Sequence, residues 1–275
     1  ILGLHKLSKE LKQLRITHIA DLHNVLRSKI LRSFFKFSTK NIAVIDKGRS
    51  EKKALTRKEN KVFKQLKTSH ERYADVFRKL GFSVDITNPT KLEKPSLATS
   101  VLSLIGEKKN NWIGIAPFAA FDSKMYPLDL MEKVIDILSN KYTVLLFGGG
   151  EKEIALLSKI EQKNEAVISV AGKLNLREEL NLIAHLECML AMDSGNAHFA
   201  AMLQIPTITT WGATHPFAGF VPFNQPKENS LLPDLEKYPN IPCSIYGNKI
   251  CDGYEDVMRT ISPERVIKKV EEILN

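Results

Sequence analysis

The chain has 275 residues, of which 43% are hydrophobic and 26% charged, with 14 glycines and 12 prolines. This composition excludes collagen-like, low-complexity and largely disordered proteins. The net charge of +9 is unevenly divided. Residues 1–110 carry 25 of the 40 Lys and Arg but only 10 of the 31 Asp and Glu, which gives +15 there and −6 in residues 111–275. We expect the basic part either to face an anionic partner or to form an ordinary lysine-rich surface.

The cysteines and the apolar runs of the chain indicate which cellular compartment to expect. Cys188, Cys243 and Cys251 are too few and too scattered for a disulfide scaffold, which predicts a reducing compartment. Cys243 and Cys251 also lack a further Cys or His at zinc-finger spacing, so a metal site is not expected. No apolar run reaches the roughly 18 residues of a membrane span, and charged residues interrupt the opening stretch. We therefore expect a soluble, cytoplasmic protein.

The first part of the chain is predicted to mix helices with short strands. Two prolines and the lack of a long apolar run mark residues 85–100 as a linker. The expected domains are therefore residues 1–100, including this linker, and residues 101–275, which end in a helix. Apolar spacing predicts a helix over residues 4–14, a strand over 16–22, a basic helix over 25–37, a strand over 41–45, a loop over 46–61 and a helix ending near residue 80.

The second part alternates regularly between strands and helices. This rhythm predicts an α/β fold with a parallel, doubly wound sheet, in which ligands bind at the carboxyl ends of the strands. The predicted strands cover residues 112–116, 143–147, 167–170, 188–192 and 205–211, and the predicted helices cover 128–138, 151–163, 176–185 and 196–203.

The most informative strand end is Asp193-Ser-Gly-Asn-Ala-His198. Gly195 allows a tight turn, and the N–H groups at the start of the following helix form an anion site. His198, in the first turn, would add a donor to a diphosphate. The plainer explanation is that Ser194 and its neighbours cap the helix while His198 packs beneath a loop. The residues alone leave both explanations open.

Other strand ends carry weaker signals. Gly148-Gly-Gly-Glu151 is either an ordinary turn or a turn whose acidic residue accepts hydrogen bonds from ribose hydroxyls. Lys124 is either a surface lysine or the cation that neutralises a leaving phosphate. His215 is expected to position its loop. The chain has no GxGxxG and no GxxxxGK[ST], which disfavours a classical NAD-dependent enzyme and a P-loop NTPase.

Taken in order, the motifs at the strand ends are more specific than each alone. Ala171-Gly-Lys-x-Asn-Leu, Asp193-Ser-Gly-Asn-Ala-His-x-Ala-Ala, Ile205-Pro-Thr and Trp211-Gly-Ala-Thr-His-Pro together resemble the bacterial heptosyltransferases of glycosyltransferase family 9. The resemblance is weaker over residues 1–85, where it rests on Asp21-Leu-His-x-Val-Leu-Arg27. It implies the GT-B architecture, with two Rossmann-like domains facing a cleft and the N-terminal domain incomplete.

The resemblance also implies the substrates. The C-terminal domain would bind a nucleotide sugar such as ADP-heptose, with no tightly bound cofactor and no metal. The basic N-terminal domain would bind an anionic acceptor, the lipopolysaccharide core on lipid A, at the inner face of the cytoplasmic membrane. The implied donor-binding residues are Lys124, Gly149, Glu151, Leu174, Asp193, Ser194, Gly195 and His198. The acceptor-side candidates are Arg27, Arg49 and Arg72. Each of these three is equally well explained as a surface arginine.

The implied reaction is an inverting transfer in which a carboxylate deprotonates the acceptor. In the resembling family this base lies on a loop after the first N-terminal strand, and that unit has no counterpart in the chain. Either this segment is missing from the sequence as given, which we expect, or another group such as Asp21 replaces the base, or the protein is inactive. A chain complete as given is expected to be weakly active or inactive. The alternatives are a GT-B enzyme for another nucleotide sugar and a non-catalytic remnant that binds nucleotide or glycolipid. Nucleic-acid binding is disfavoured because its motifs are missing.

Overall fold

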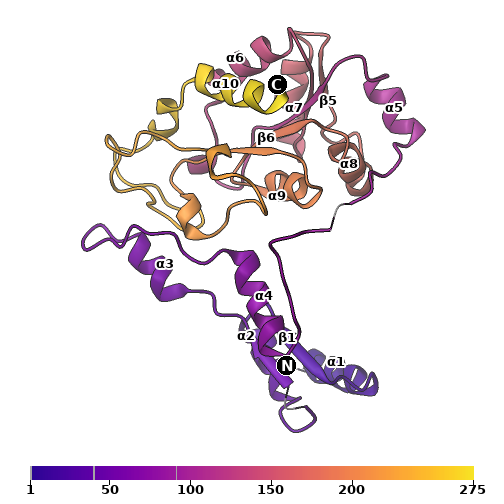
Figure 1. Cartoon of the computed structure of the whole chain (residues 1–275), viewed down its shortest axis with the longest axis vertical. Coiled ribbons are helices and arrows are strands. Elements are labelled where there is room, and N and C mark those ends of the chain that lie inside the picture. The colour runs from indigo at the N-terminus through magenta and orange to yellow at the C-terminus, as the bar shows by residue number, and fades with distance from the viewer. Residues whose placement is uncertain (1, 40, 91) are drawn as a thin grey trace. The chain divides into compact units, whose positions relative to one another are not determined.

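The computed structural model describes residues 2–39, 41–90 and 92–275. The chain forms two compact units (Figure 1). Unit 1 comprises residues 1–51 and 66–89, and unit 2 comprises residues 52–65 and 90–275. The short segment 52–65 therefore packs with unit 2, although its neighbours on both sides in sequence belong to unit 1. None of the helices in the described parts of the chain is long and apolar enough to cross a membrane.

Unit 1 is built on two parallel strands, β1 (His18–Asp21) and β2 (Asn41–Val44). Its hydrophobic core is small and centres on Ala43, Ile45 and Val76. The helices of this region are α1 (Leu2–Gln13), α2 (Leu26–Ser33) and α4 (Ser69–Lys79). These elements confirm the predicted alternation of helices and strands.

The loop predicted over residues 46–61 is wrong in part, because α3 (Arg49–Leu55) lies within it. This helix is rich in charge, yet Lys52 and Leu55 are both buried and stand three residues apart. Residues at that spacing share one helix face. The lysine at one of the two buried positions hid the helical pattern in the sequence.

Unit 2 contains a six-stranded parallel sheet with the strand order β5-β4-β3-β6-β7-β8. The α/β class and five of the strands were predicted. The sixth strand, β8, was missed because it has two residues. The strands are β3 (Trp112–Ala116), β4 (Thr143–Leu146), β5 (Val167–Ser169), β6 (Cys188–Met192), β7 (Thr207–Thr210) and β8 (Ser230–Leu231).

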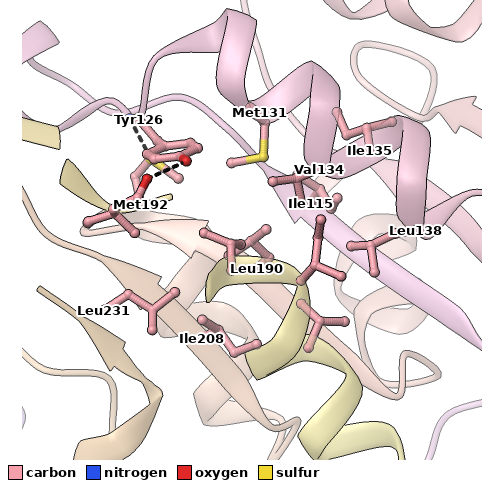
Figure 2. Close-up of a cluster of buried hydrophobic side chains, with 14 of the residues drawn as sticks. Ile115, Tyr126, Met131, Val134, Ile135, Leu138, Leu190, Met192, Ile208 and Leu231 are labelled. Carbon is pink, nitrogen blue, oxygen red and sulfur yellow. Dashed lines mark hydrogen bonds between the residues drawn. The ribbon is translucent and has the colours of Figure 1, made fainter. Parts of the chain in front are cut away.

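Side chains alternate between the two faces of this sheet, so each face has its own core. Ile113 and Ile115 of β3 join the core with α6, α7 and α10, whereas Trp112 and Ala116 join the core with α5, α8 and α9. Figure 2 shows the first core, where the Tyr126 hydroxyl donates to the Ile261 carbonyl at 2.7 Å. The helices are α5 (Thr99–Ile105), α6 (Leu128–Leu138), α7 (Glu151–Glu161), α8 (Leu176–Ile183), α9 (Gly195–Met202) and α10 (Pro263–Leu274).

The strand order reverses direction between β3 and β6, which pair side by side. Loops that leave the carboxyl ends of two such strands diverge and open a crevice. Lys124 lies in the loop after β3, and Asp193 follows β6 directly. The topology therefore brings residues about seventy positions apart in sequence to one edge of the sheet.

Candidate functional site

A pocket of about 300 Å³ lies at this edge, entirely within unit 2. We call it the Lys124 pocket. It combines cationic and polar groups with an apolar wall. Its lining residues are Ala120, Lys124, Asp193, Ser194, Gly195, His198, Phe220, Ile245 and Tyr246.

An ion pair holds the cation of the pocket in place. Lys124 Nζ lies 2.9 Å from Asp193 Oδ2, with the two side chains 13% and 8% exposed. The same Asp193 oxygen accepts a hydrogen bond from the Thr214 hydroxyl at 3.0 Å. A carboxylate fixed by a second donor restricts the ammonium that pairs with it. Lys124 is therefore placed before any ligand arrives.

The backbone around Lys124 is fixed as well. The Ser123 carbonyl accepts a hydrogen bond from the Ala213 amide at 2.9 Å, and the Ser123 hydroxyl donates to the Gly247 carbonyl. Gly247 has a φ of +82° and lies so close that a Cβ there would come within 2.3 Å of Lys124 Cδ. Only glycine can adopt this positive φ and also let the backbone lie so close to the Lys124 side chain, because it has no Cβ. The loop that contains Gly247 thus clamps the aliphatic part of Lys124.

The N-terminus of α9 faces the same pocket. Ser194 is the N-cap residue, yet its side chain makes no capping hydrogen bond, and its Oγ is buried without a partner in the described part of the chain. The interpretation that the Ser194 side chain merely caps this helix is therefore wrong. The first N–H groups of a helix have no intrahelical acceptor and favour an anion.

His198 supplies a further donor to the pocket. Burial lowers the pKa of its imidazole, Asp193 partly offsets this effect, and Lys124 lowers the pKa further. The ring is therefore neutral at pH 7 and carries one N–H.

A second pocket, of about 230 Å³, includes Gly149 and Asn196, so it adjoins the same helix start. Glu151, the residue expected from the motif, is exposed and is not among the residues that line this pocket. Glu153 takes that place, since its carboxylate accepts the Gly149 amide at 2.8 Å. A helix that begins at Glu151 places Glu153 in position to reach back toward its own start, which is the signal that was overlooked.

Glu179 also lines the second pocket, and burial raises the pKa of its carboxyl. It comes from α8, far from the glycine turn in sequence, and no motif pointed to it. Leu174 packs against the core between the sheet and α8, and it lines neither of the two pockets. Two carboxyl groups beside a glycine turn suit a ligand that carries hydroxyl or amino donors.

The arginines proposed for the acceptor differ in their surroundings. Arg27 and Arg49 are exposed. Arg72 is buried, and its guanidinium pairs with Glu51 at 2.7 Å and donates to the carbonyls of Asp46 and Lys67, each at 3.1 Å. The structure thus accounts for Arg72 without an acceptor. It ties α4 to the start of α3 and to the end of β2.

Asp21, the candidate base, is similarly engaged. One of its oxygens accepts the amides of His23 and Asn24, and the other pairs with Arg32 at 2.9 Å. Burial raises the pKa of this carboxyl, but the hydrogen bonds and Arg32 outweigh burial, so the pKa lies below its ordinary value. A carboxylate held in this way is poorly suited to accept a proton from a substrate hydroxyl.

In the C-terminal loops, the pairing of the cysteines differs from what the sequence predicts, and the position of His215 agrees with it. Cys243 and Cys251 form a disulfide, which was not anticipated from the sequence. His215 does position its loop, since its Nδ1 accepts the Phe217 amide and caps a short 3-10 turn. Among residues 2–39, 41–90 and 92–275, no three His, Cys, Asp or Glu side chains gather to hold a metal ion.

Comparison with known proteins identifies the family. The family model described as "Glycosyltransferase family 9 (heptosyltransferase)" matches residues 4–244. The chain belongs to glycosyltransferase family 9. It is 29% identical over 185 residues to lipooligosaccharide heptosyltransferase 2 of Haemophilus influenzae, covering 62% of the chain and 49% of that protein. It is 25% identical over 206 residues to lipopolysaccharide heptosyltransferase 1 of Campylobacter coli, covering 72% and 54%. The chain spans about half the length of the curated relatives it matches.

Solved structures of this family show the same fold. The family 9 glycosyltransferase from Veillonella parvula superposes with a TM-score of 0.70 at 18% identity, covering 99% of the chain and 78% of that structure. The ADP-heptose heptosyltransferase II of E. coli gives 0.64 at 17% identity, covering 98% and 80%. The E. coli heptosyltransferase WaaC, solved with ADP, gives 0.59 at 17% identity, covering 96% and 77%. These likenesses confirm the α/β class and the GT-B type inferred from the motifs.

Proposed function

We propose that unit 2 binds a nucleotide sugar, ADP-heptose, and that the chain transfers its heptose to an anionic lipopolysaccharide core with inversion. The observation that carries this proposal is the convergence of Lys124, His198 and the N-terminus of α9 on one pocket. A diphosphate needs both positive charge and N–H donors, and the pocket offers an ammonium, an imidazole N–H and free backbone amides. The names of the family relatives support heptose as the sugar.

In this reaction the acceptor hydroxyl attacks the anomeric carbon while the bond from that carbon to the diphosphate breaks. Charge develops on the departing ADP, where Lys124 and the helix start would stabilise it. The acceptor proton must pass to a base. We assign no residue to that role, because Asp21 is held by Arg32 and by two backbone amides.

The acceptor would be bound through the basic part of the chain. Arg27 and Arg49 are exposed there, and a phosphorylated lipid core needs cations that face solvent. The same charge would bring the protein to the inner face of the cytoplasmic membrane as a peripheral, cytoplasmic enzyme. No tightly bound cofactor enters this proposal.

Calorimetric titration with ADP and then ADP-heptose tests the donor site. Lys124→Ala should weaken ADP binding about thirtyfold, since it removes a charged partner of the diphosphate. The matched control is Lys141→Ala. Lys141 also pairs with a carboxylate, Glu271, but it precedes β4 and so lies at the opposite edge of the sheet. Failure of the wild-type protein to bind ADP, with UDP and GDP tried alongside, would overturn the proposal.

A second candidate function is binding of a nucleotide sugar without transfer. The engagement of Asp21 favours it, because the one carboxylate expected to replace the family base is not available as a base. Release of ADP from ADP-heptose in the presence of lipopolysaccharide core separates the two functions. Tight ADP-heptose binding with no release would establish the second.

A further inference from the structure

The Lys124 pocket has an apolar wall that the diphosphate does not need. Phe220, Ile245 and Tyr246 form this wall, and Tyr246 is 58% exposed. The rings of Phe220 and Tyr246 lie 5.7 Å apart at a tilt of 44°. Lys52 Nζ lies 4.2 Å from the centre of the Phe220 ring, and the Lys52 side chain is itself buried. An exposed tyrosine beside a supported phenylalanine forms a surface suited to a flat apolar partner.

The loop that carries Tyr246 is held rigidly. The Cys243–Cys251 disulfide closes it, and within it the Ser244 hydroxyl accepts the amides of Tyr246 and Gly247 at 3.3 and 3.0 Å. The next residue along, Gly247, is the one that clamps Lys124. One short loop therefore fixes both the cation of the pocket and its aromatic wall, so their spacing is set in the absence of ligand.

The two pockets divide the nucleotide sugar between them. Both adjoin the start of α9, since Gly195 lines the Lys124 pocket and the next residue, Asn196, lines the second pocket. A diphosphate at this helix start would have one of its substituents on each side. The second pocket offers Glu153 and Glu179 to the hydroxyl and amino groups of a nucleoside. The sugar, on the other side of the diphosphate, would then contact the aromatic wall of the Lys124 pocket.

We propose that Tyr246 and Phe220 form the surface on which the transferred sugar stacks, which makes Tyr246 a residue that selects for the sugar. This inference rests on the proposed function, because it presumes a nucleotide sugar in the pocket. A sugar ring presents C–H groups on its faces and hydroxyls around its rim. An aromatic ring covers the faces and leaves the hydroxyls at the rim to hydrogen-bond with polar groups around them.

The test compares two ligands on four variants by calorimetry. Tyr246→Ala should weaken ADP-heptose binding about tenfold while the affinity for ADP stays within about twofold, because only the sugar loses a contact. Tyr246→Phe should bind both ligands as the wild type does, since it keeps the ring. Tyr73→Ala is the matched control, an exposed tyrosine in unit 1. Thermal unfolding of each variant establishes that it is folded.

The outcomes separate this inference from the proposed function. Equal losses for ADP and ADP-heptose in Tyr246→Ala would mean that the base stacks on this wall, and no loss for either would mean that the wall is unused. Both results overturn the inference and leave the proposed function standing. No ADP binding by the wild type overturns both. Phe220→Leu, which keeps apolar volume without a ring, should weaken ADP-heptose in the same direction as Tyr246→Ala.

Discussion

The two units of the chain stabilise themselves in different ways. Unit 2 has a six-stranded sheet with a hydrophobic core on each face, whereas unit 1 has two strands and a core centred on three small or medium side chains. Unit 1 gains further stability from buried charged side chains. Arg72 and Asp21 are both buried there and both engage an ion pair together with backbone groups. Small units with little apolar surface to bury depend more heavily on such contacts.

This difference bears on what the polar side chains of each unit do. In unit 2 the sheet supplies the stability, and a polar group at a strand end, the Ser194 hydroxyl, is buried without a partner among the described residues. In unit 1 two of the residues singled out from the sequence, Asp21 and Arg72, hold the fold together. In the smaller unit, polar residues that the sequence suggests as site residues are therefore more often needed for the fold.

The largest expected effect comes from removing the central ion pair of unit 1. Arg72→Met should destabilise unit 1 by about 3 kcal/mol, since it removes a buried guanidinium that pairs with the half-exposed Glu51 and takes the donor away from two carbonyls. Hydrogen exchange measures this locally, with faster exchange of the β2 amides and unchanged exchange of β3 and β6. Arg27→Met is the matched control at an exposed position. Unchanged β2 exchange would show that the core of unit 1 suffices without Arg72.

The next effect concerns unit 2, where the side chain of His215 is buried. Burial, followed by the charge of Lys61, lowers the pKa of His215 to about 4. In the unfolded chain this imidazole takes up a proton near its ordinary value of 6.5. Its stabilising contribution is therefore complete above pH 6.5 and is lost as the pH falls from there toward 4.

We expect this contribution to fall by about 2 kcal/mol between pH 7.5 and pH 5. His215→Asn keeps an acceptor for the Phe217 amide but does not titrate, so it isolates the effect. Urea unfolding of both proteins at the two pH values measures it. The stability advantage of the wild type over the variant should shrink on acidification. A constant difference would mean that His215 stays accessible to protons in the folded chain.

Much of unit 2 was predictable from the sequence, and much less of unit 1. Some strands of unit 2, such as Cys188–Met192, are continuous apolar runs, because a parallel sheet covered on both faces buries its central strands. Strand ends in such a sheet converge, so Lys124 and Asp193 were foreseeable as neighbours. In α3 a charged residue takes one of the two buried positions, and periodicity cannot detect it.

The parts of the site that were missed depend on tertiary contact alone. Glu179 reaches the second pocket from a helix with no motif, and Tyr246 reaches the Lys124 pocket from a loop after the last strand. The disulfide that shapes this loop was overlooked, because two cysteines at this spacing fit a pair of free thiols equally well. Sequence patterns report what a segment buries, and they do not report which distant segment it meets.

A third prediction concerns the clamp on Lys124. Gly247→Ala should weaken ADP binding about tenfold, because the new methyl group displaces Lys124, the lysine proposed to pair with the diphosphate. Gly253→Ala is a close control. Gly253 has a similar φ of +78°, but a Cβ added there would meet nothing within 4 Å, so this variant carries the same backbone strain without the collision. Equal affinities of the two variants for ADP would show that Lys124 adapts, and that the site is less preorganised than the contacts around it indicate.

The smallest expected effect comes from substituting an exposed arginine of unit 1. Here the two units are compared only by their electrostatic attraction to an anionic surface. Arg27→Ala should weaken binding to vesicles containing anionic lipid about fourfold at low salt, in keeping with the modest contribution of one arginine near a charged surface. The effect should vanish at high salt, because screening removes it. Arg177→Ala makes the same charge change at an exposed position in unit 2 and should leave binding unchanged. If the two variants lose affinity equally, net charge alone attracts the protein and unit 1 presents no particular face to the membrane. If Arg27→Ala alone loses affinity, unit 1 is the part of the chain that meets the anionic surface.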